Sequence, residues 1–243
     1  LRVLMTTQRI YPSSQKTLLA LQDEVQRWDY RAAPVRYVDN QDQHPNSGEE
    51  IKTFLSGLLS FRLGDAEALQ QASRTLAARA AARPQARLPR SLAHTLEALI
   101  AWQQGDAAAA LDKLDQSAMN VTYYETLHSP FWRQDFNRYL RAEILLEQRR
   151  YEESLRWYTA TVDGFFSNSF YLPISYLRRA EIHEALGDFA KAIEYKSKFI
   201  DLWQDCDAAL RPVVQEVRKN RDRLLQEKAK EPADKSRQVE GKK

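Results

Sequence analysis

The sequence predicts an all-α protein, a helical solenoid of about four helical hairpins with flanking helices. A Gly-Asp pair separates two helix-like segments at three places in the 243-residue chain. With one related turn, these pairs recur about every 40 residues, which is typical of stacked helical repeats. The prolines fall between the expected hairpins and not inside helices, where each would cost about 3 kcal/mol. The pairs are Gly64-Asp65, Gly105-Asp106 and Gly187-Asp188.

Each Gly-Asp pair is expected to end one helix and to begin the next. Glycine suits the left-handed backbone conformation that ends many helices. The aspartate after it can accept hydrogen bonds from the free backbone N–H groups of the next first turn. Each pair therefore predicts the turn of one hairpin.

A fourth turn has no glycine. Arg149 stands between two segments of helical period, where the other turns have glycine. Taking Arg149 as equivalent to the glycines gives spacings of 41, 44 and 38 residues. Because a Cβ atom disfavours the left-handed conformation, we expect this turn to be less sharp or strained.

Prolines, turns and composition divide the chain into three parts. Residues 1–47 are expected to form a helix, from about Ser14 to Trp28, and a polar loop. Residues 48–228 form the repeat domain, and residues 229–243 a charged, disordered tail. The Ser47-x-x-Glu50 pattern predicts a capping box at the first helix.

The repeat domain should contain four hairpins and one covering helix. This last helix has an apolar face that can cover the open side of the terminal hairpin, as solenoids require. The hairpins are expected at about 48–82, 90–118, 130–166 and 171–204, and the capping helix at 208–228. The apolar residues of the capping helix are Val213, Val217, Leu224 and Leu225.

Composition excludes several classes of protein. Hydrophobic residues make up 43% of the chain, but no run approaches the ~20 apolar residues of a membrane helix. The single cysteine, Cys206, excludes an internal disulfide framework and a cysteine-based zinc site, and it fits a reducing compartment. We therefore expect a cytoplasmic protein with no membrane partner. The chain starts at Leu1 without a leader pattern, so we expect no signal peptide and a longer reading frame upstream.

The fourth hairpin resembles the tetratricopeptide repeat (TPR). This family places an aromatic residue, a small residue four positions later, a Gly-Asp-aromatic turn and an Ala-Ile pair at these positions. The resemblance implies a right-handed α–α superhelix with a concave, partner-binding face. The matching residues are Tyr176, Ala180, His183, Gly187-Asp188-Phe189, Ala192-Ile193, Tyr195 and Phe199.

A closer resemblance covers residues 56–225. The segments 129–143, 151–158, 176–182 and 199–205 are similar to TPR regions that lie C-terminal to bacterial serine/threonine kinases, nucleotide cyclases or DNA-binding regulators, as in acidobacteria. This resemblance implies the C-terminal part of a bacterial signalling protein.

No catalytic, metal-binding or cofactor-binding motif is complete. His183-Glu184 begins like a zinc-protease helix, but Gly187 stands where the second histidine belongs, so His183 is interpreted as a packing residue. Asp39, Asp42 and His44 could meet a metal, although a solvated loop is the expected state. Phosphate-binding, dinucleotide-binding and nucleophile-elbow motifs are missing. We expect no enzyme, no metal and no cofactor.

The basic run from Arg218 to Arg223 first suggests nucleic-acid binding. Glu216 and Asp222 dilute its charge, and the net charge of the chain is only +3. A solvated helix face is the expected role, with no nucleic-acid partner.

The TPR resemblance implies that first-helix residues grip a protein or peptide. The mixed apolar and acidic character of these faces predicts a ligand with basic and apolar side chains. We interpret the chain as a noncatalytic scaffold or adaptor module. The alternative is a self-association module that forms a homodimer of its parent protein. The expected contact residues are Phe61, Trp102, Gln103, Tyr139, Glu143, Leu177, Arg178 and Glu181.

Overall fold

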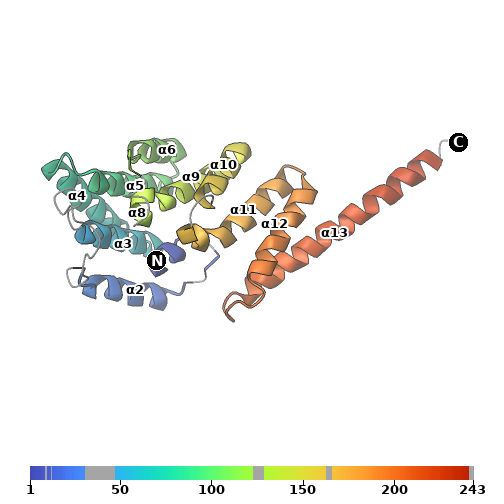
Figure 1. The fold of residues 1–243 in the computed structure, drawn as a ribbon, viewed down its shortest axis with the longest axis horizontal. Coiled ribbons are helices and arrows are strands. Elements are labelled where there is room, and N and C mark those ends of the chain that lie inside the picture. Colours follow the sequence, from blue (N-terminus) through green and yellow to red (C-terminus); the bar gives the residue numbers. More distant parts are fainter. Residues whose placement is uncertain (9, 12, 31–46, 123–128, 163–165, 241–243) are drawn as a thin grey trace. The chain divides into compact units, whose positions relative to one another are not determined.

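The structure is a computed structural model that describes residues 1–240 except 9, 12, 31–46, 123–128 and 163–165. Side chains of residues 166–168 and 230–240 lie outside the description. The described residues form twelve α-helices and one short 3-10 helix, with no strand among them (Figure 1). The all-α prediction is confirmed.

The chain divides into two compact units, Leu1–Gln148 and Arg149–Lys243. The first unit contains two short or isolated helices followed by hairpins, and the second contains one hairpin with flanking helices. The first unit comprises α1 (Arg2–Thr6), α2 (Gln15–Arg27), α3 (Gly48–Leu63), α4 (Ala66–Ala82), α5 (Arg87–Gln103), α6 (Ala107–Gln116), α8 (Pro130–Arg133) and α9 (Asp135–Glu147). The second unit comprises α10 (Tyr151–Val162), η1 (Phe166–Tyr171), α11 (Leu172–Ala185), α12 (Phe189–Leu202) and α13 (Arg211–Glu240).

Neighbouring helices pack on each other in sequence order within each unit. In the first unit α3 packs on α4, α4 on α5 and α5 on α6, and α6 also contacts α9. In the second unit α11 packs on both α10 and α12, and α12 packs on α13. None of the described helices combines the length and the apolar composition that crossing a membrane requires.

The three Gly-Asp turns are built as the sequence predicts. The glycines adopt φ of 77°, 83° and 76°, which is the left-handed region. A side-chain oxygen of each aspartate accepts a hydrogen bond from the backbone N–H three residues later, at 2.9, 2.9 and 3.2 Å. Arg149 has φ of 56°, so it adopts the same left-handed conformation with a side chain attached.

One glycine allows α3 to approach its neighbours closely. A Cβ atom on Gly57 would lie 2.7 Å from Leu96 Cδ1 of α5 and 3.2 Å from the Cβ of Ala72 in α4. Both distances are shorter than ordinary van der Waals contact, and Leu96 is fully buried. The missing side chain is therefore what lets these three helices meet.

The predicted capping box at α3 is wrong. The Ser47 side chain does not cap the first turn of α3. Glu50 instead turns inward, with 3% exposure, and forms ion pairs with Arg79 and Arg83 at the end of α4. Burial of a carboxylate needs such charged partners, and here the tertiary contacts outweigh the local cap.

The helix expected from residue 130 breaks at Gln134, whose φ is 60°. The Gln134 side chain donates hydrogen bonds to the Ser91 hydroxyl at 2.9 Å and to the Ser117 carbonyl at 2.6 Å. On either side of the break, Arg133 and Asp135 form a fully buried ion pair at 2.7 Å. Long-range polar contacts thus hold a non-glycine residue in the left-handed region.

The predicted capping helix corresponds to α13, which continues to Glu240 instead of ending near residue 228. This continuation includes Pro232 and part of the segment expected as a disordered tail, so here a proline does lie inside a helix, against the expectation from the sequence. At its start, Val214 and Val217 pack against Phe199 and Ile200 of α12. This apolar cluster covers the end of the last hairpin, as the sequence predicts.

Candidate functional site

The expected contact residues fall on both units, and each unit is considered by itself. Phe61 and Trp102 stand near the ends of α3 and α5, with their rings stacked at 6.2 Å and 18°. Trp102 Nε1–H donates a 2.7 Å hydrogen bond to Glu147 Oε2 of α9. Gln103 is exposed beside them. The aromatic pair thus connects α3 with α5, and the Trp102 hydrogen bond connects α5 with α9.

Two of the expected contact residues are not on the surface. Tyr139 and Glu143 of α9 are each only 3% exposed, so neither offers surface to a partner. They are one helical turn apart and share the inward face of α9, where Tyr139 contacts Phe136 at 6.4 Å. The expectation that a charged Glu143 would face a ligand is wrong, because this residue belongs to the interior of the unit.

In the second unit, α11, α12 and α13 enclose a groove of about 510 Å³, here called the acidic groove. Its lining includes two expected residues of α11, Leu177 and Glu181. Apolar atoms come from Leu177 and from Val213 and Val217 of α13, all packed at the apolar cluster beneath. Three carboxylates and one ammonium group line it, so the described lining carries a net negative charge.

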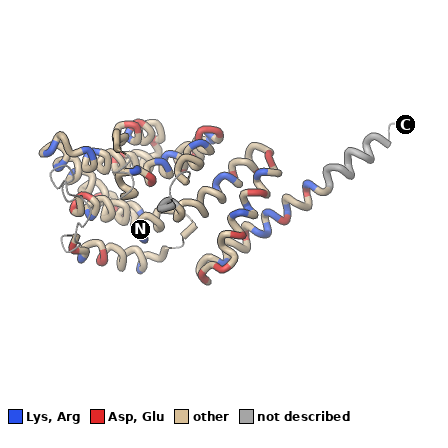
Figure 2. The backbone as a smooth tube through the Cα atoms, viewed as in Figure 1, with Lys and Arg blue, Asp and Glu red and all other residues tan. Residues whose placement is uncertain are grey.

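Of the three carboxylates, which belong to Glu181, Glu184 and Glu216, that of Glu184 is neutralised by two basic side chains. Its carboxylate lies 2.9 Å from Nζ of Lys196, which is 3% exposed, and 2.7 Å from a guanidinium nitrogen of Arg223. The pKa of Arg223 is raised above its ordinary value, mainly by its hydrogen bond to Glu227 and to a smaller extent by its hydrogen bond to Glu184. This triad connects α11, α12 and α13 and fixes one end of the acidic groove. Charged residues of both signs alternate along these helices (Figure 2).

The other two carboxylates of the acidic groove are less fully neutralised than Glu184. Glu181 is paired only along its own helix, with Arg178 at 2.7 Å. Glu216 is exposed on α13 and forms no ion pair with any other described residue. Asn220 lines the same groove, and its buried Oδ1 lacks a donor among the described residues. The acidic groove thus offers negative charge and apolar surface together.

Arg178 itself does not line the acidic groove, but it positions Glu181, which does. The sequence placed Leu177 and Glu181 correctly on one helix face, because they are four residues apart. It missed Glu216 and Asn220, since α13 was read only as a capping helix. Their signal was the polar side of an amphipathic helix, which by itself does not distinguish a groove wall from a solvated face.

His183 and Cys206, which were considered as catalytic or metal-binding residues, both pack against neighbouring side chains. His183 is 9% exposed, and its ring stacks on Tyr195 at 5.6 Å and 8°. Burial lowers the pKa of His183. Cys206 is a free thiol that packs against the apolar cluster between α12 and α13. Asp39, Asp42 and His44 lie outside the described residues, and in the described part of the chain no three metal-ligating side chains gather.

Comparison of this chain with protein-family models, with curated proteins and with solved structures finds no match. The functional interpretation therefore rests on the residues and on their arrangement.

Proposed function

We propose that this chain is a noncatalytic protein-interaction module of the TPR type, whose hairpins continue one right-handed superhelix. The shared geometry of three turns, with a left-handed glycine and an aspartate cap in each, supports a repeat origin. On the resemblance of its sequence, the module belongs to the C-terminal part of a bacterial signalling protein in the cytoplasm.

Within this module, the acidic groove binds a basic, amphipathic peptide or helix. The observation that carries this proposal is that Glu181 and Glu216 line the same groove as apolar Leu177, Val213 and Val217. An apolar side chain that fills such a site contributes about 1.5–3 kcal/mol when fully buried. Exposed ion pairs contribute only about 0.2–1 kcal/mol each. Affinity then comes mainly from apolar anchors, while the carboxylates select a basic partner and speed its association.

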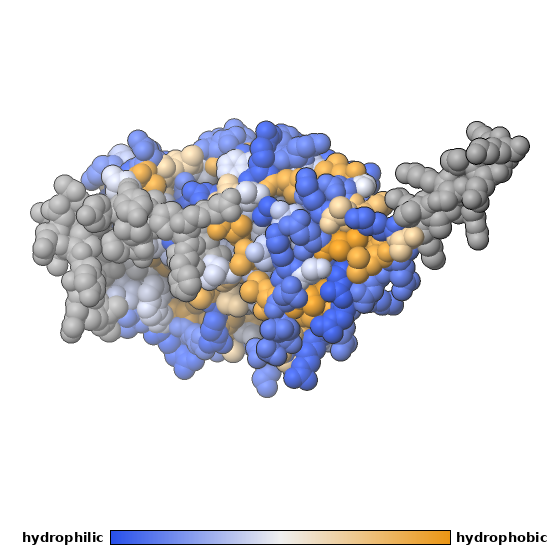
Figure 3. All heavy atoms as spheres, turned by 45° about the vertical axis from the view of Figure 1, so that its right-hand side comes forward, coloured by the Kyte–Doolittle hydropathy of each residue, from blue (hydrophilic) through white to orange (hydrophobic). Residues whose placement is uncertain are grey.

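The acidic groove is small, so the bound segment is short. On the face in Figure 3, hydrophobic surface is divided into small areas by hydrophilic side chains. A partner therefore gains little from broad apolar contact and depends on a few anchors. We expect weak, salt-sensitive binding, in the range of micromolar dissociation constants.

The test is fluorescence polarisation with a labelled amphipathic Leu/Lys peptide. We expect saturable binding that weakens with salt, and no binding of the matched Leu/Glu peptide. A Glu181→Gln and Glu216→Gln double variant should bind several-fold more weakly. The control is a Glu67→Gln and Asp112→Asn double variant, an equal change of charge at exposed positions of α4 and α6. Equal binding by the double variant and the control would place the peptide elsewhere.

Self-association is the second candidate function. Leu202 of α12 and Leu225 of α13 are exposed by 48% and 45%, so both are available for a contact between copies. Sedimentation at tens of micromolar should then show a dimer that Leu225→Glu dissociates. Leu19→Glu, at an equally exposed leucine of α2, is the matched control. A strict monomer contradicts this alternative.

A further inference from the structure

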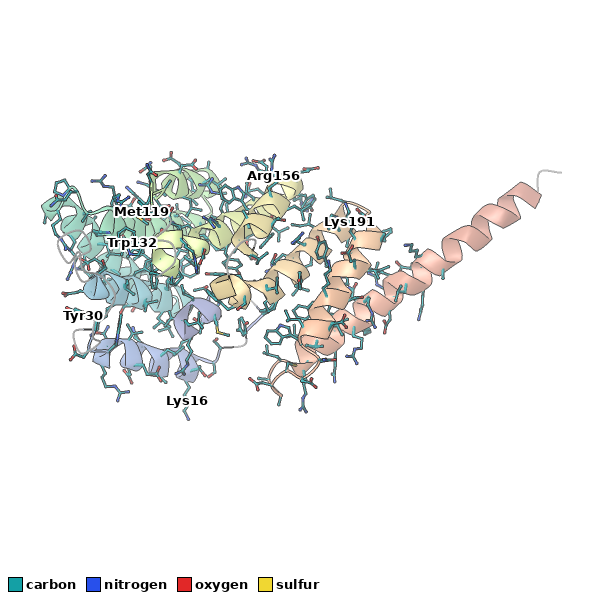
Figure 4. The ribbon with its side chains drawn as sticks, viewed as in Figure 1. Lys16, Tyr30, Met119, Trp132, Arg156 and Lys191 are labelled. Atoms are coloured by element: carbon teal, nitrogen blue, oxygen red, sulfur yellow. The ribbon has the colours of Figure 1, made fainter. Side chains whose placement is uncertain are left out.

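A second depression in the second unit has the opposite charge. It lies between α10, α11 and α12, has a volume of about 530 Å³, and shares no lining residue with the acidic groove. Arg156, Arg179 and Lys191 line it, and its described lining includes no carboxylate. We call it the cationic pocket. Figure 4 labels Arg156 on α10 and Lys191 at the start of α12.

Arg179 is held rigidly at this pocket. Its guanidinium carbon lies 4.3 Å from the centre of the Tyr195 ring, and one terminal nitrogen donates a hydrogen bond to the Tyr195 hydroxyl. The ring of His183 is also stacked on Tyr195. A guanidinium on an aromatic ring keeps its planar fork of donors preorganised.

One donor of Arg179 has no acceptor. Its Nε is buried and has no hydrogen-bond partner among the described residues. Leaving a buried donor unsatisfied costs about 1–3 kcal/mol. This atom has almost no exposed surface, so an anion in the pocket would meet the positive charge of the guanidinium group rather than Nε itself.

The neighbouring acids neutralise only part of the positive charge. Asp188 lies 3.4 Å from Nζ of Lys191 and 3.6 Å from Nδ1 of His183. A backbone hydrogen bond from Lys191 is the main cause that lowers the pKa of Asp188, so this group stays ionised. Arg156 is exposed and forms no ion pair with any described residue. Glu153 and Glu194 lie within electrostatic reach of Arg156 and Arg179, but neither arginine forms a close ion pair with a described residue.

The size and walls of the pocket indicate more than a simple ion. A phosphate group alone occupies a small part of about 530 Å³. Leu155 and the rings of His183 and Tyr195 supply apolar and flat wall surface beside the arginines. Guanidinium groups bind phosphate oxygens in a bidentate manner, which suits Arg156 and Arg179. We propose that the cationic pocket binds the phosphate group of a small phosphorylated organic molecule.

The test uses isothermal calorimetry with three probes: inorganic phosphate, phenyl phosphate and phenol. We expect saturable binding of phenyl phosphate, weaker binding of inorganic phosphate and none of phenol. Arg156→Gln and Lys191→Gln should each weaken phenyl phosphate binding about tenfold, because each removes one charged contact. Both side chains are exposed, so these variants should keep the fold, which far-UV circular dichroism checks. Arg218→Gln, an exposed change on α13 outside the pocket, is the matched control.

Three results would overturn the proposal. One is the absence of saturable phenyl phosphate binding, and another is an equal loss of affinity in Arg218→Gln, which would indicate only general charge attraction. Equal affinity for phenyl phosphate and inorganic phosphate would overturn the inference that the ligand contains an organic group. Peptide binding in the acidic groove is a separate measurement, so failure of one proposal leaves the other standing.

Discussion

Replacing Arg149 by glycine should stabilise the protein. Arg149 has φ of 56°, where the Cβ atom of an ordinary residue costs about 1–2 kcal/mol. Glycine removes this cost but adds about 0.4–1 kcal/mol of conformational freedom to the unfolded chain. The net expectation is a gain of about 0.5–1 kcal/mol in the free energy of unfolding. The Arg149 side chain is exposed, so its removal should cost little packing energy.

The assay is urea unfolding followed by far-UV circular dichroism, supported by thermal melting. A gain of 1 kcal/mol raises the melting temperature by about 2–4 °C for a chain of this size. Arg149→Ala is the matched control, since it removes the same charge but keeps Cβ in the left-handed conformation. We expect its stability to stay within about 0.5 kcal/mol of the wild type. If Arg149→Gly is no more stable than Arg149→Ala, backbone strain at this turn is not the cause.

Three further changes test the packing, a cap and a titration. Gly57→Ala should lower the free energy of unfolding in urea by about 1 kcal/mol, because overpacking against Leu96 costs more than alanine gains in helix propensity. A second change, Leu96→Val, should recover part of this loss. Asp106→Ala should lose about 1 kcal/mol of stability with its cap to Ala109, whereas Asp106→Asn should lose little. As pH falls below the ordinary histidine pKa of about 6.5, unfolding midpoints should decrease, because the imidazole of His183 binds a proton more readily in the unfolded chain than when it is buried. This part of the decrease should be absent in His183→Phe.

The local architecture was predictable because it depends on short-range chemistry. Gly64 and Asp65 specify a turn through backbone conformation and one hydrogen bond three residues away. The same local rule applies at the other two Gly-Asp turns. The helix face of Leu177 and Glu181 was predictable from periodicity alone. Their neighbours across the acidic groove were not, because they depend on how α13 packs on α12.

Burial of individual polar residues was the main point that the sequence did not determine. Glu143 looked available on a helix face but is buried in the first unit. Glu50 looked like part of a helix cap but pairs with two arginines of α4. In both cases a long-range environment decides between solvent and interior, and no local pattern contains that information.

The sequence by itself determined the helices, their turns and the order in which they pack, because backbone propensity, capping and apolar periodicity act over a few residues. Only the tertiary structure decided which charged residues gather at one groove or pocket. Arg156 and Arg179 come together across α10 and α11, while Glu181 and Glu216 come together across α11 and α13. Residues far apart in the chain become neighbours only when helices pack, and electrostatic energy depends on those distances and on burial.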